Sequence, residues 1–278
     1  MVRQKEDARR ILLVGAGKMG GALIEAWLEQ EIIQPSDIVL IEPDIVRAEH
    51  FRDRYSLYTF ETLEAVNIGV GQPIVVFAIK PQIMGTVVPL YRSLAQQGAL
   101  ILSIAAGKNL DYFEGILGTN SPIVRAMPNT PASIGKGMTV LCSNGCVNSE
   151  QKVLCQDLMS AVGKVRWIDN EKLMDPVTAV SGSEPAYVFL LIEVLGEAGI
   201  KAGLDQNLAY ELALTTVTGA ATLAEQSTLT PSVLRQNVTS PGGTTEAALE
   251  VLMSDDGLSE LFFRAINQAV ARSKELAS

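Results

Sequence analysis

The sequence is poor in the side chains that most catalytic and metal sites use. Its 278 residues include one histidine and three cysteines, namely His50, Cys142, Cys146 and Cys155. We expect His50 to be solvated on a surface helix, since nothing around it suggests a catalytic role. The cysteines do not have a zinc-ligand spacing and are expected to pack as small apolar groups. These shortages argue against a histidine-based triad and against a metal centre.

Clustered basic charge and long apolar runs are also missing. The formal net charge is -9, with no run of Lys and Arg, which argues against a nucleic-acid partner. The continuous apolar run between the charged leader and Gly15 has only four residues, too few for the core of a signal peptide. We find no apolar run near the roughly 20 residues of a membrane span. The expectation is a cytoplasmic protein that binds neither nucleic acid nor membrane.

The strongest local signal is a glycine motif after a short apolar run. Ile11–Val14 suits a strand buried on both faces, and a Gly-x-Gly-x-x-Gly motif follows it directly. In such a motif the first glycine allows a tight turn, the second lets backbone N–H groups approach a pyrophosphate, and the third allows close packing of helix on strand. The alternative is a glycine turn in another kind of doubly wound domain. The predicted cofactor-binding residues here are Gly15, Gly17, Lys18, Met19 and Gly20.

An acid follows the second apolar run at a distance that suits the motif. Ile38–Ile41 is predicted to be a strand, and Glu42 ends it at about the 20-residue spacing of a ribose-binding acid. We therefore add Glu42 to the predicted cofactor site.

The pattern of apolar run and loop then repeats. It predicts a doubly wound, mainly parallel sheet, of the Rossmann-like α/β class, in which successive loops line one crevice beside the nicotinamide. The predicted further strands are 73–79, 99–104, 122–126, 137–142 and 165–168, and the predicted helices are 45–54, 61–66, one carrying Ile83, Val87, Leu90 and Leu94, and 150–162. The loops of the crevice are Gly15–Gly20, Lys80-Pro81, Ala105–Gly107 and Met127–Pro131.

The strand signal ends near residue 170. Helices are predicted at 185–202, 207–226, 245–253 and 258–276. They carry little polar surface, which indicates a core shared with another subunit. We predict a dinucleotide-binding domain at 1–169 and a smaller, all-helical substrate-binding and dimerisation domain at 170–278.

Two loops of the helical half contrast with their apolar surroundings. In 180–187, Ser183 is placed as a helix N-cap. In 239–246, two glycines and two threonines precede a helix, where unpaired N–H groups and the helix dipole favour a small carboxylate. Ordinary helix capping explains the second loop equally well on its own.

Six segments together resemble the pyrroline-5-carboxylate reductases over nearly the whole chain. They are Gly15–Gly20, Ala78–Pro81, Ser103–Gly107, Arg125–Pro131, Ser181–Val188 and Ser240–Thr245. The resemblance implies reduction of 1-pyrroline-5-carboxylate to L-proline with NADH or NADPH, the last step of proline biosynthesis. It also implies a homodimer through the C-terminal helices, often assembled further into a ring such as a decamer.

The resemblance also implies roles for single residues. It puts the substrate carboxylate on Ser240, Gly243 and Thr244, and the catalytic Thr245 hydroxyl near the imine nitrogen. The residues that it places around the ribose and nicotinamide are Lys80, Pro81, Ala105 and Asn129.

Two positions depart from the family pattern. Family members that prefer NADPH carry small or basic residues where this chain has Glu42, so we expect NADH to be favoured. Glu184 stands where the family has a small residue. It is either an ordinary acid at a helix start or a residue at the mouth of the substrate pocket.

Two other functions fit parts of the sequence. One is a 3-hydroxyacid dehydrogenase of the 6-phosphogluconate type, for which Lys201 is the nearest candidate base, although a lysine at a helix end is common. The other is a non-catalytic protein that senses NAD(P).

Overall fold

The computed structural model describes residues 11–66 and 72–277. The chain forms two compact units, which we call the sheet unit (Met1–Gly182 with Val270–Ser278) and the helical unit (Ser183–Ala269). The division therefore falls once after Gly182 and once inside the last helix. The functional boundary between residues 169 and 170 stays a prediction.

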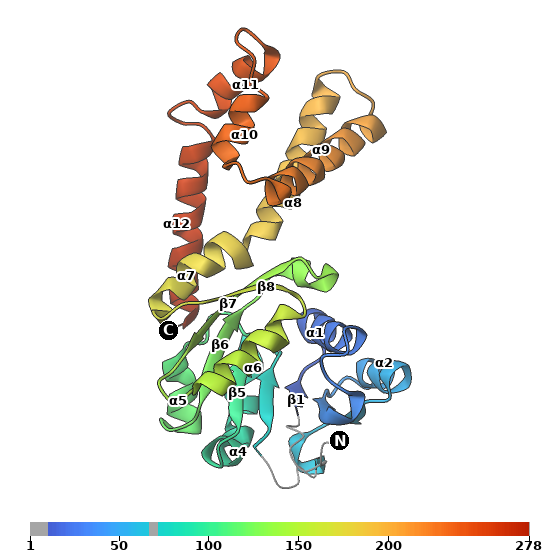
Figure 1. Ribbon diagram of the computed structural model, residues 1–278, viewed down its shortest axis with the longest axis vertical. Helices are drawn as coiled ribbons and strands as arrows, with labels where there is room; N and C mark the ends of the chain where they lie inside the picture. Colours follow the sequence, from blue (N-terminus) through green and yellow to red (C-terminus); the bar gives the residue numbers. More distant parts are fainter. Residues whose placement is uncertain (1–10, 67–71, 278) are drawn as a thin grey trace. The chain divides into compact units, whose positions relative to one another are not determined.

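The sheet unit is built on one sheet of eight strands, in the order β3-β2-β1-β4-β5-β6-β7-β8 (Figure 1). Neighbouring strands are parallel throughout, except for β6 and β7, which pair antiparallel. The predicted fold class is thus confirmed. The strands are β1 (Ile11–Val14), β2 (Ile38–Ile41), β3 (Tyr58–Phe60), β4 (Ile74–Phe77), β5 (Leu100–Ser103), β6 (Ile123–Met127), β7 (Gly137–Ser143) and β8 (Gly163–Trp167).

Helices cover both faces of this sheet. One core cluster joins alternate strand residues to α1 (Lys18–Glu29), α2 (Ile45–Tyr55) and α6 (Ser149–Ser160). The other face packs against α3 (Met84–Val87), α4 (Arg92–Gln96), α5 (Leu110–Leu117) and α7 (Met174–Val177). Since side chains alternate between the faces of a strand, strands that are apolar throughout need this cover on both sides. The Trp27 indole N–H also donates to the Leu158 carbonyl at 2.7 Å, tying α1 to α6.

Several short elements of the sheet unit differ from the sequence-based expectation. The helix predicted through Ile83 and Leu94 is broken, because Pro89 lacks the N–H that a continuous helix needs. The helix predicted at 61–66 is a single 3₁₀ turn, and α5 was not predicted at all. The 3₁₀ turns are Pro35–Asp37, Leu63–Ala65, Pro81–Ile83, Val88–Tyr91, Thr130–Ile134 and Glu171–Leu173.

The helical unit contains the four helices that the apolar pattern predicts and one more. They are α8 (Glu184–Lys201), α9 (Gln206–Gln226), α10 (Pro231–Asn237), α11 (Thr244–Leu252) and α12 (Leu258–Ala277), whose last turns belong to the sheet unit. The unpredicted helix is α10, although Thr230 and Pro231 form an ordinary helix start: the Thr230 side chain caps the Val233 N–H. Gly196 lets α8 and α9 approach, since a Cβ there would lie 2.5 Å from Tyr210 Cδ1.

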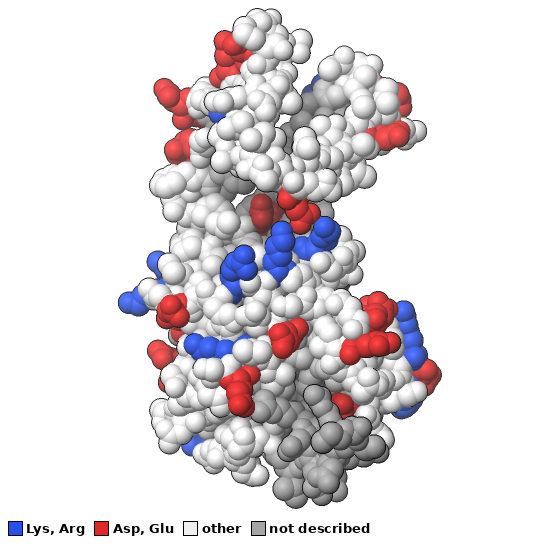
Figure 2. Space-filling model, viewed as in Figure 1, with Lys and Arg blue, Asp and Glu red and all other residues white. Residues whose placement is uncertain are grey.

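The surface of the helical unit is unusually apolar. Among the 18 residues of α8 only Gly196 is buried, and α11 has no buried residue. Most of this unit is uncharged on the face in Figure 2. The exposed large apolar side chains include Phe189, Leu190, Leu191, Val194, Leu195, Leu208, Leu212, Leu214, Leu223, Val251, Leu252, Leu258, Leu261, Phe262 and Phe263, which we call the apolar helical face.

Ser183 occupies the predicted N-cap position of α8, with Pro185 in the first turn, but it does not cap the helix with its side chain. A π-helical turn, Thr178–Gly182, follows α7 directly and leads into α8. Ser183 has helical backbone angles (φ -92°, ψ -22°) and makes no side-chain cap bond. No free helix start therefore exists at this point of the described chain.

Because the helical turns before α8 run on into it, they form one long helical stretch together with α8. By length and composition alone, Glu171–Lys201 is long and apolar enough to cross a membrane, and only 6% of its most apolar window is buried. The expectation that no run reaches such a length is therefore wrong by this measure. Length and composition do not distinguish a membrane span from a helix that another protein surface covers.

Candidate functional site

The glycine loop after β1 has the geometry that its sequence predicts. Gly15 has φ +95°, and a Cβ there would lie 2.7 Å from Ile79 Cγ2 and 2.8 Å from the Ala78 carbonyl oxygen. A side chain at this position would therefore be strained and would collide with the two residues that follow β4. A Cβ at Gly17 would meet nothing within 4 Å, so the space in front of the loop is open to a ligand.

The start of α1 offers several unused hydrogen-bond donors. Gly17 occupies the N-cap without a side-chain cap, and the first intrahelical bond runs from the Gly21 N–H to the Gly17 carbonyl, at 2.8 Å. Within the described part of the chain, the N–H groups of residues 17–20 have no partner. Four such donors at the positive end of a helix fit a pyrophosphate.

Glu42 lies at the end of β2 and is tied to the glycine loop. Its carboxylate is buried, with 4% of the residue exposed. It accepts the Ala16 N–H at 2.7 Å and the Asp44 N–H at 2.9 Å, and it pairs with Arg47 at 3.2 Å. The sequence predicted the position of this acid but not its bond to the loop. Its role toward a ribose stays a prediction.

The other predicted loops emerge at the same edge of the sheet. Because β1, β4, β5 and β6 are parallel, the loops after them leave at their common carboxyl ends. Lys80 is exposed and Pro81 begins a 3₁₀ turn, whereas Ala105 is buried and donates its N–H to Ser103 Oγ at 3.3 Å. The structure thus brings the predicted cofactor residues of the sheet unit together at one edge.

Asn129, after β6, is buried and already uses both ends of its amide. Its oxygen accepts the Met138 N–H at 2.8 Å, and its nitrogen donates to the Ser181 carbonyl at 3.3 Å. Asn129 therefore holds the π-helical turn to the sheet. The sequence contained no signal for this contact, because it joins residues that are far apart in the chain.

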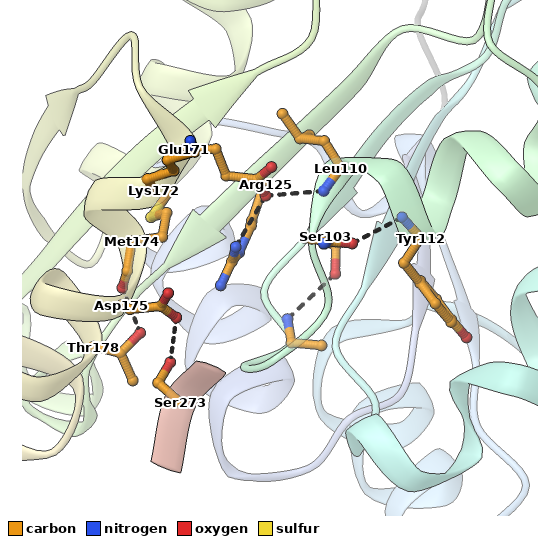
Figure 3. Close-up of polar contacts among 12 residues, drawn as sticks. Ser103, Leu110, Tyr112, Arg125, Glu171, Lys172, Met174, Asp175, Thr178 and Ser273 are labelled. Carbon is orange, nitrogen blue, oxygen red and sulfur yellow. Dashed lines mark hydrogen bonds and ion pairs between the residues drawn. The ribbon is translucent and has the colours of Figure 1, made fainter. Parts of the chain in front are cut away.

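The sequence analysis also missed an ion pair between a buried arginine and a partly exposed glutamate (Figure 3). Arg125 of β6 meets Glu171 at 2.9 Å, and the same carboxylate oxygen accepts the Leu110 N–H at the start of α5, at 2.9 Å. Burial, and next the charge of Glu171, raise the pKa of the Cys142 thiol. The available signal was a charge inside an otherwise apolar strand, which usually means a buried partner.

The scarce side chains form no metal site in the described part of the chain. No group of three or more His, Cys, Asp and Glu side chains there could hold a metal ion. Cys142 and Cys155 are buried, but Cys146 is exposed and contacts the Thr119 carbonyl oxygen at 3.3 Å. The prediction that all three cysteines pack as apolar groups is therefore wrong for Cys146, which lies in a turn. His50 is exposed on α2.

In the helical unit, residues 240–245 form the turn that begins α11. Gly242 has φ +71°, its N–H donates to the Glu246 carboxylate at 2.7 Å, and the Gly243 N–H donates to the Ser240 carbonyl at 3.0 Å. Among the hydrogen bonds of the described residues, the N–H groups of Thr244 and Thr245 have no partner. Part of the helix start is thus used by Glu246, which the sequence analysis did not single out, and part remains available to an anion.

Two other predicted positions lie on α8. Glu184 is exposed near its start, and Lys201 is exposed at its end. Neither side chain makes a hydrogen bond or ion pair with another described residue.

Two family models match separate segments of this chain. The family model of NADP oxidoreductases, coenzyme F420-dependent, matches residues 10–107, and the model of pyrroline-5-carboxylate reductase dimerisation matches residues 171–276. With the doubly wound sheet and the open glycine loop, they define a nicotinamide-dependent oxidoreductase with a helical dimerisation region.

Relatives identify the family. The chain is 39% identical to pyrroline-5-carboxylate reductase of Pseudomonas aeruginosa, over 96% of this chain and 97% of that protein. It is 36% identical to that of Synechocystis, over 95% and 97%. The structure of a Coxiella burnetii pyrroline-5-carboxylate reductase matches with a TM-score of 0.90 and 36% identity, over 98% of this chain and 100% of that one. A Plasmodium falciparum pyrroline carboxylate reductase with NADP bound matches with a TM-score of 0.82 and 32% identity, over 97% and 98%. The chain belongs to the pyrroline-5-carboxylate reductase family.

Proposed function

We propose that this protein reduces 1-pyrroline-5-carboxylate to L-proline with NAD(P)H, the last step of proline biosynthesis. The observation that carries the proposal is near full-length similarity to named reductases, combined with two open helix starts, at α1 and α11. A cyclic imine is already electrophilic at carbon, especially when its nitrogen is protonated. The protein therefore has to provide orientation, which is worth about 7 to 11 kcal/mol, and little acid–base chemistry.

The glycine loop fits a dinucleotide. The open space at Gly17 and the four unpartnered N–H groups of residues 17–20 would receive the pyrophosphate. When bound, the reduced nicotinamide supplies the hydride. Lys80, Pro81, Ala105 and Asn129 would surround the nicotinamide half. Because the Asn129 side-chain amide is occupied, its part is to shape the pocket wall.

The start of α11 would hold the substrate carboxylate. In this proposal Ser240 and the backbone N–H of Thr244 bind it, together with the Gly243 N–H once that group turns from the Ser240 carbonyl. The Thr245 hydroxyl makes no hydrogen bond with the described residues, which leaves it available to the imine nitrogen. It would orient that nitrogen and help deliver its proton.

We propose that NADH is the preferred donor. The Glu42 carboxylate lies at the end of β2 beside the glycine loop, where it can accept a hydrogen bond from a ribose hydroxyl. A 2′-phosphate at about 4 Å would meet a repulsion of about 4 kcal/mol at an effective dielectric of 20. Arg47, paired with Glu42 at 3.2 Å, reduces this repulsion without removing it.

We also propose a cytoplasmic homodimer, on which a ring such as a decamer could be built. The dimerisation model covers the segment that carries the apolar helical face, which would pack against a second copy. A protein released without detergent and dimeric by analytical ultracentrifugation would support this proposal. Extraction only with detergent would contradict it and favour membrane contact through Glu171–Lys201.

The activity is tested by following NADH absorbance at neutral pH with 1-pyrroline-5-carboxylate added, and by identifying proline among the products. A parallel assay with NADPH separates a wrong cofactor preference from a wrong activity. Consumption of neither cofactor by folded, oligomeric protein would overturn the proposed reaction.

A further inference from the structure

The end of α12 is part of the sheet unit and not of the helical unit. The division between the units falls inside this helix, so that Val270–Ser278 clusters with the strands. Contacts with the sheet unit are needed to hold the last turns of α12 against it. Among the described residues, one polar contact and one close packing contact at Leu276 hold them there.

The polar contact joins Ser273 to Asp175. The Ser273 hydroxyl donates to the Asp175 carboxylate at 2.6 Å, and Ser273 is 5% exposed. Figure 3 shows Asp175 reaching from α7 to Ser273 on α12. A short, largely buried bond between a hydroxyl and a carboxylate is stronger than an ordinary neutral hydrogen bond. It fixes the rotation of the last turns of α12.

The second contact places α12 directly against Gly107. A Cβ at Gly107 would lie 3.1 Å from Leu276 Cβ and 3.2 Å from the Leu276 carbonyl oxygen, and Gly107 has φ +72°. The contact therefore uses atoms of Leu276, Cβ and the carbonyl oxygen, that every residue except glycine would provide. Gly107 ends the loop Ala105–Gly107, which leaves the carboxyl end of β5.

The rest of this loop is fixed from other directions. At its start Ala105 bonds to Ser103, and after it the Leu110 N–H bonds to Glu171, four residues before Asp175. The segment carrying Glu171 and Asp175 thus holds both the end of the loop and the helix that covers it.

We propose that the last turns of α12 are a positioning element for the cofactor, in which Ser273 and the backbone at Leu276 hold Ala105–Gly107 in its binding conformation. Neither residue touches the substrate or the cofactor; both act through the loop. This inference depends on the proposed function, in which that loop contacts the nicotinamide half of NAD(P)H.

The first test is Ser273→Ala in the full chain. We expect the KM for NADH and the dissociation constant from NADH fluorescence to rise about fivefold, within the range for one lost hydrogen bond. The KM for pyrroline-5-carboxylate and the oligomeric state should stay as in the parent. Arg272→Ala is the matched control, because it removes an exposed ion pair with Glu275 from the same turn.

The second test separates backbone packing from side-chain packing at Leu276. Deleting residues 276–278 should raise the KM for NADH as Ser273→Ala does, whereas Leu276→Ala, which keeps Cβ and the carbonyl, should leave it unchanged. If the parent is active and neither Ser273→Ala nor the deletion changes cofactor affinity, the positioning role is overturned while the reaction stands. If the parent consumes no cofactor, the proposed function fails, whereas the fluorescence titrations still test the positioning role.

Discussion

The two units of this chain bury their apolar residues to very different extents. In the sheet unit every residue of β1, β2, β4, β5 and β6 is buried, and helices cover both faces. In the helical unit the 21 residues of α9 include two buried ones, and α10 and α11 include none. Both units are rich in apolar side chains, so composition does not separate them. The sheet unit contains its own core, whereas most large apolar side chains of the helical unit are exposed in the single chain.

The largest expected effect comes from charging the apolar helical face. Leu190→Glu with Val194→Glu places two carboxylates on α8, at positions that are 56% and 51% exposed in the single chain. In a twofold dimer each change occurs twice, so we expect the dimer dissociation constant to rise at least about 10³-fold, since each buried aliphatic side chain is worth about 2 kcal/mol. Sedimentation equilibrium measures this change.

The matched control is Val153→Glu on α6, where the valine is 59% exposed on the sheet unit. We expect this variant to keep the parent's oligomeric state. If the α8 variant is as dimeric as the parent, the helical unit does not complete its core in the proposed way.

The second prediction concerns the Thr245 hydroxyl in the helical unit. Thr245→Ala should lower kcat about 10²-fold, the lower end of what a positioned proton donor contributes. The thermal midpoint should change little, since Gly243 and not Thr245 is the N-cap of α11. Thr222→Ala, which removes a hydroxyl bonded within α9 at 2.8 Å to Thr218, is the control. Equal turnover in the Thr245 variant and the parent would remove this hydroxyl from the mechanism.

The third prediction concerns the charge of Glu42 in the sheet unit. Glu42→Gln keeps an acceptor for the Ala16 N–H but removes the charge, so kcat/KM for NADPH relative to NADH should rise about 30-fold. This is less than the bare repulsion of about 4 kcal/mol would give, because Arg47 already offsets part of it. Glu49→Gln on the exposed side of α2 should leave the ratio unchanged. A parent that already prefers NADPH would contradict the proposed role of Glu42.

The parts of the molecule that the sequence predicts are those governed by local rules. The turn at Gly15 follows from backbone sterics, and the shared edge of the loops follows from parallel pairing of apolar runs. The Asn129–Ser181 contact and the Arg125–Glu171 pair were not predictable, because an apolar or polar pattern indicates burial without naming a distant partner. The same limit explains Ser183: a serine before Glu-Pro predicts the N-cap position correctly, but the preceding π-helical turn gives Ser183 helical backbone angles, and its side chain makes no cap bond.

The last prediction, about tenfold in the unfolding equilibrium for each pH unit, tests whether the core of the sheet unit is as closed as its burial indicates. Burial raises the pKa of the Cys155 thiol from 9.0 to about 12. Below pH 9 both folded and unfolded chains keep this proton, so Cys155 adds no pH dependence there. Between pH 9 and 12 the unfolded chain releases the proton while the folded chain retains it. Stability is therefore lost as the pH rises, by about 1.4 kcal/mol per pH unit.

The measurement is urea unfolding followed by tryptophan fluorescence, because Trp27 and Trp167, the two tryptophans of the chain, both lie in the sheet unit. Cys155→Ala should unfold at lower urea at pH 8, since it leaves a cavity, and should lose stability less steeply than the parent above pH 9. Cys146→Ala, which removes the exposed thiol, should keep the parent's slope. An identical slope in the Cys155 variant and the parent would mean that water reaches this side chain, so that the sheet unit is less closed than the contrast with the helical unit requires.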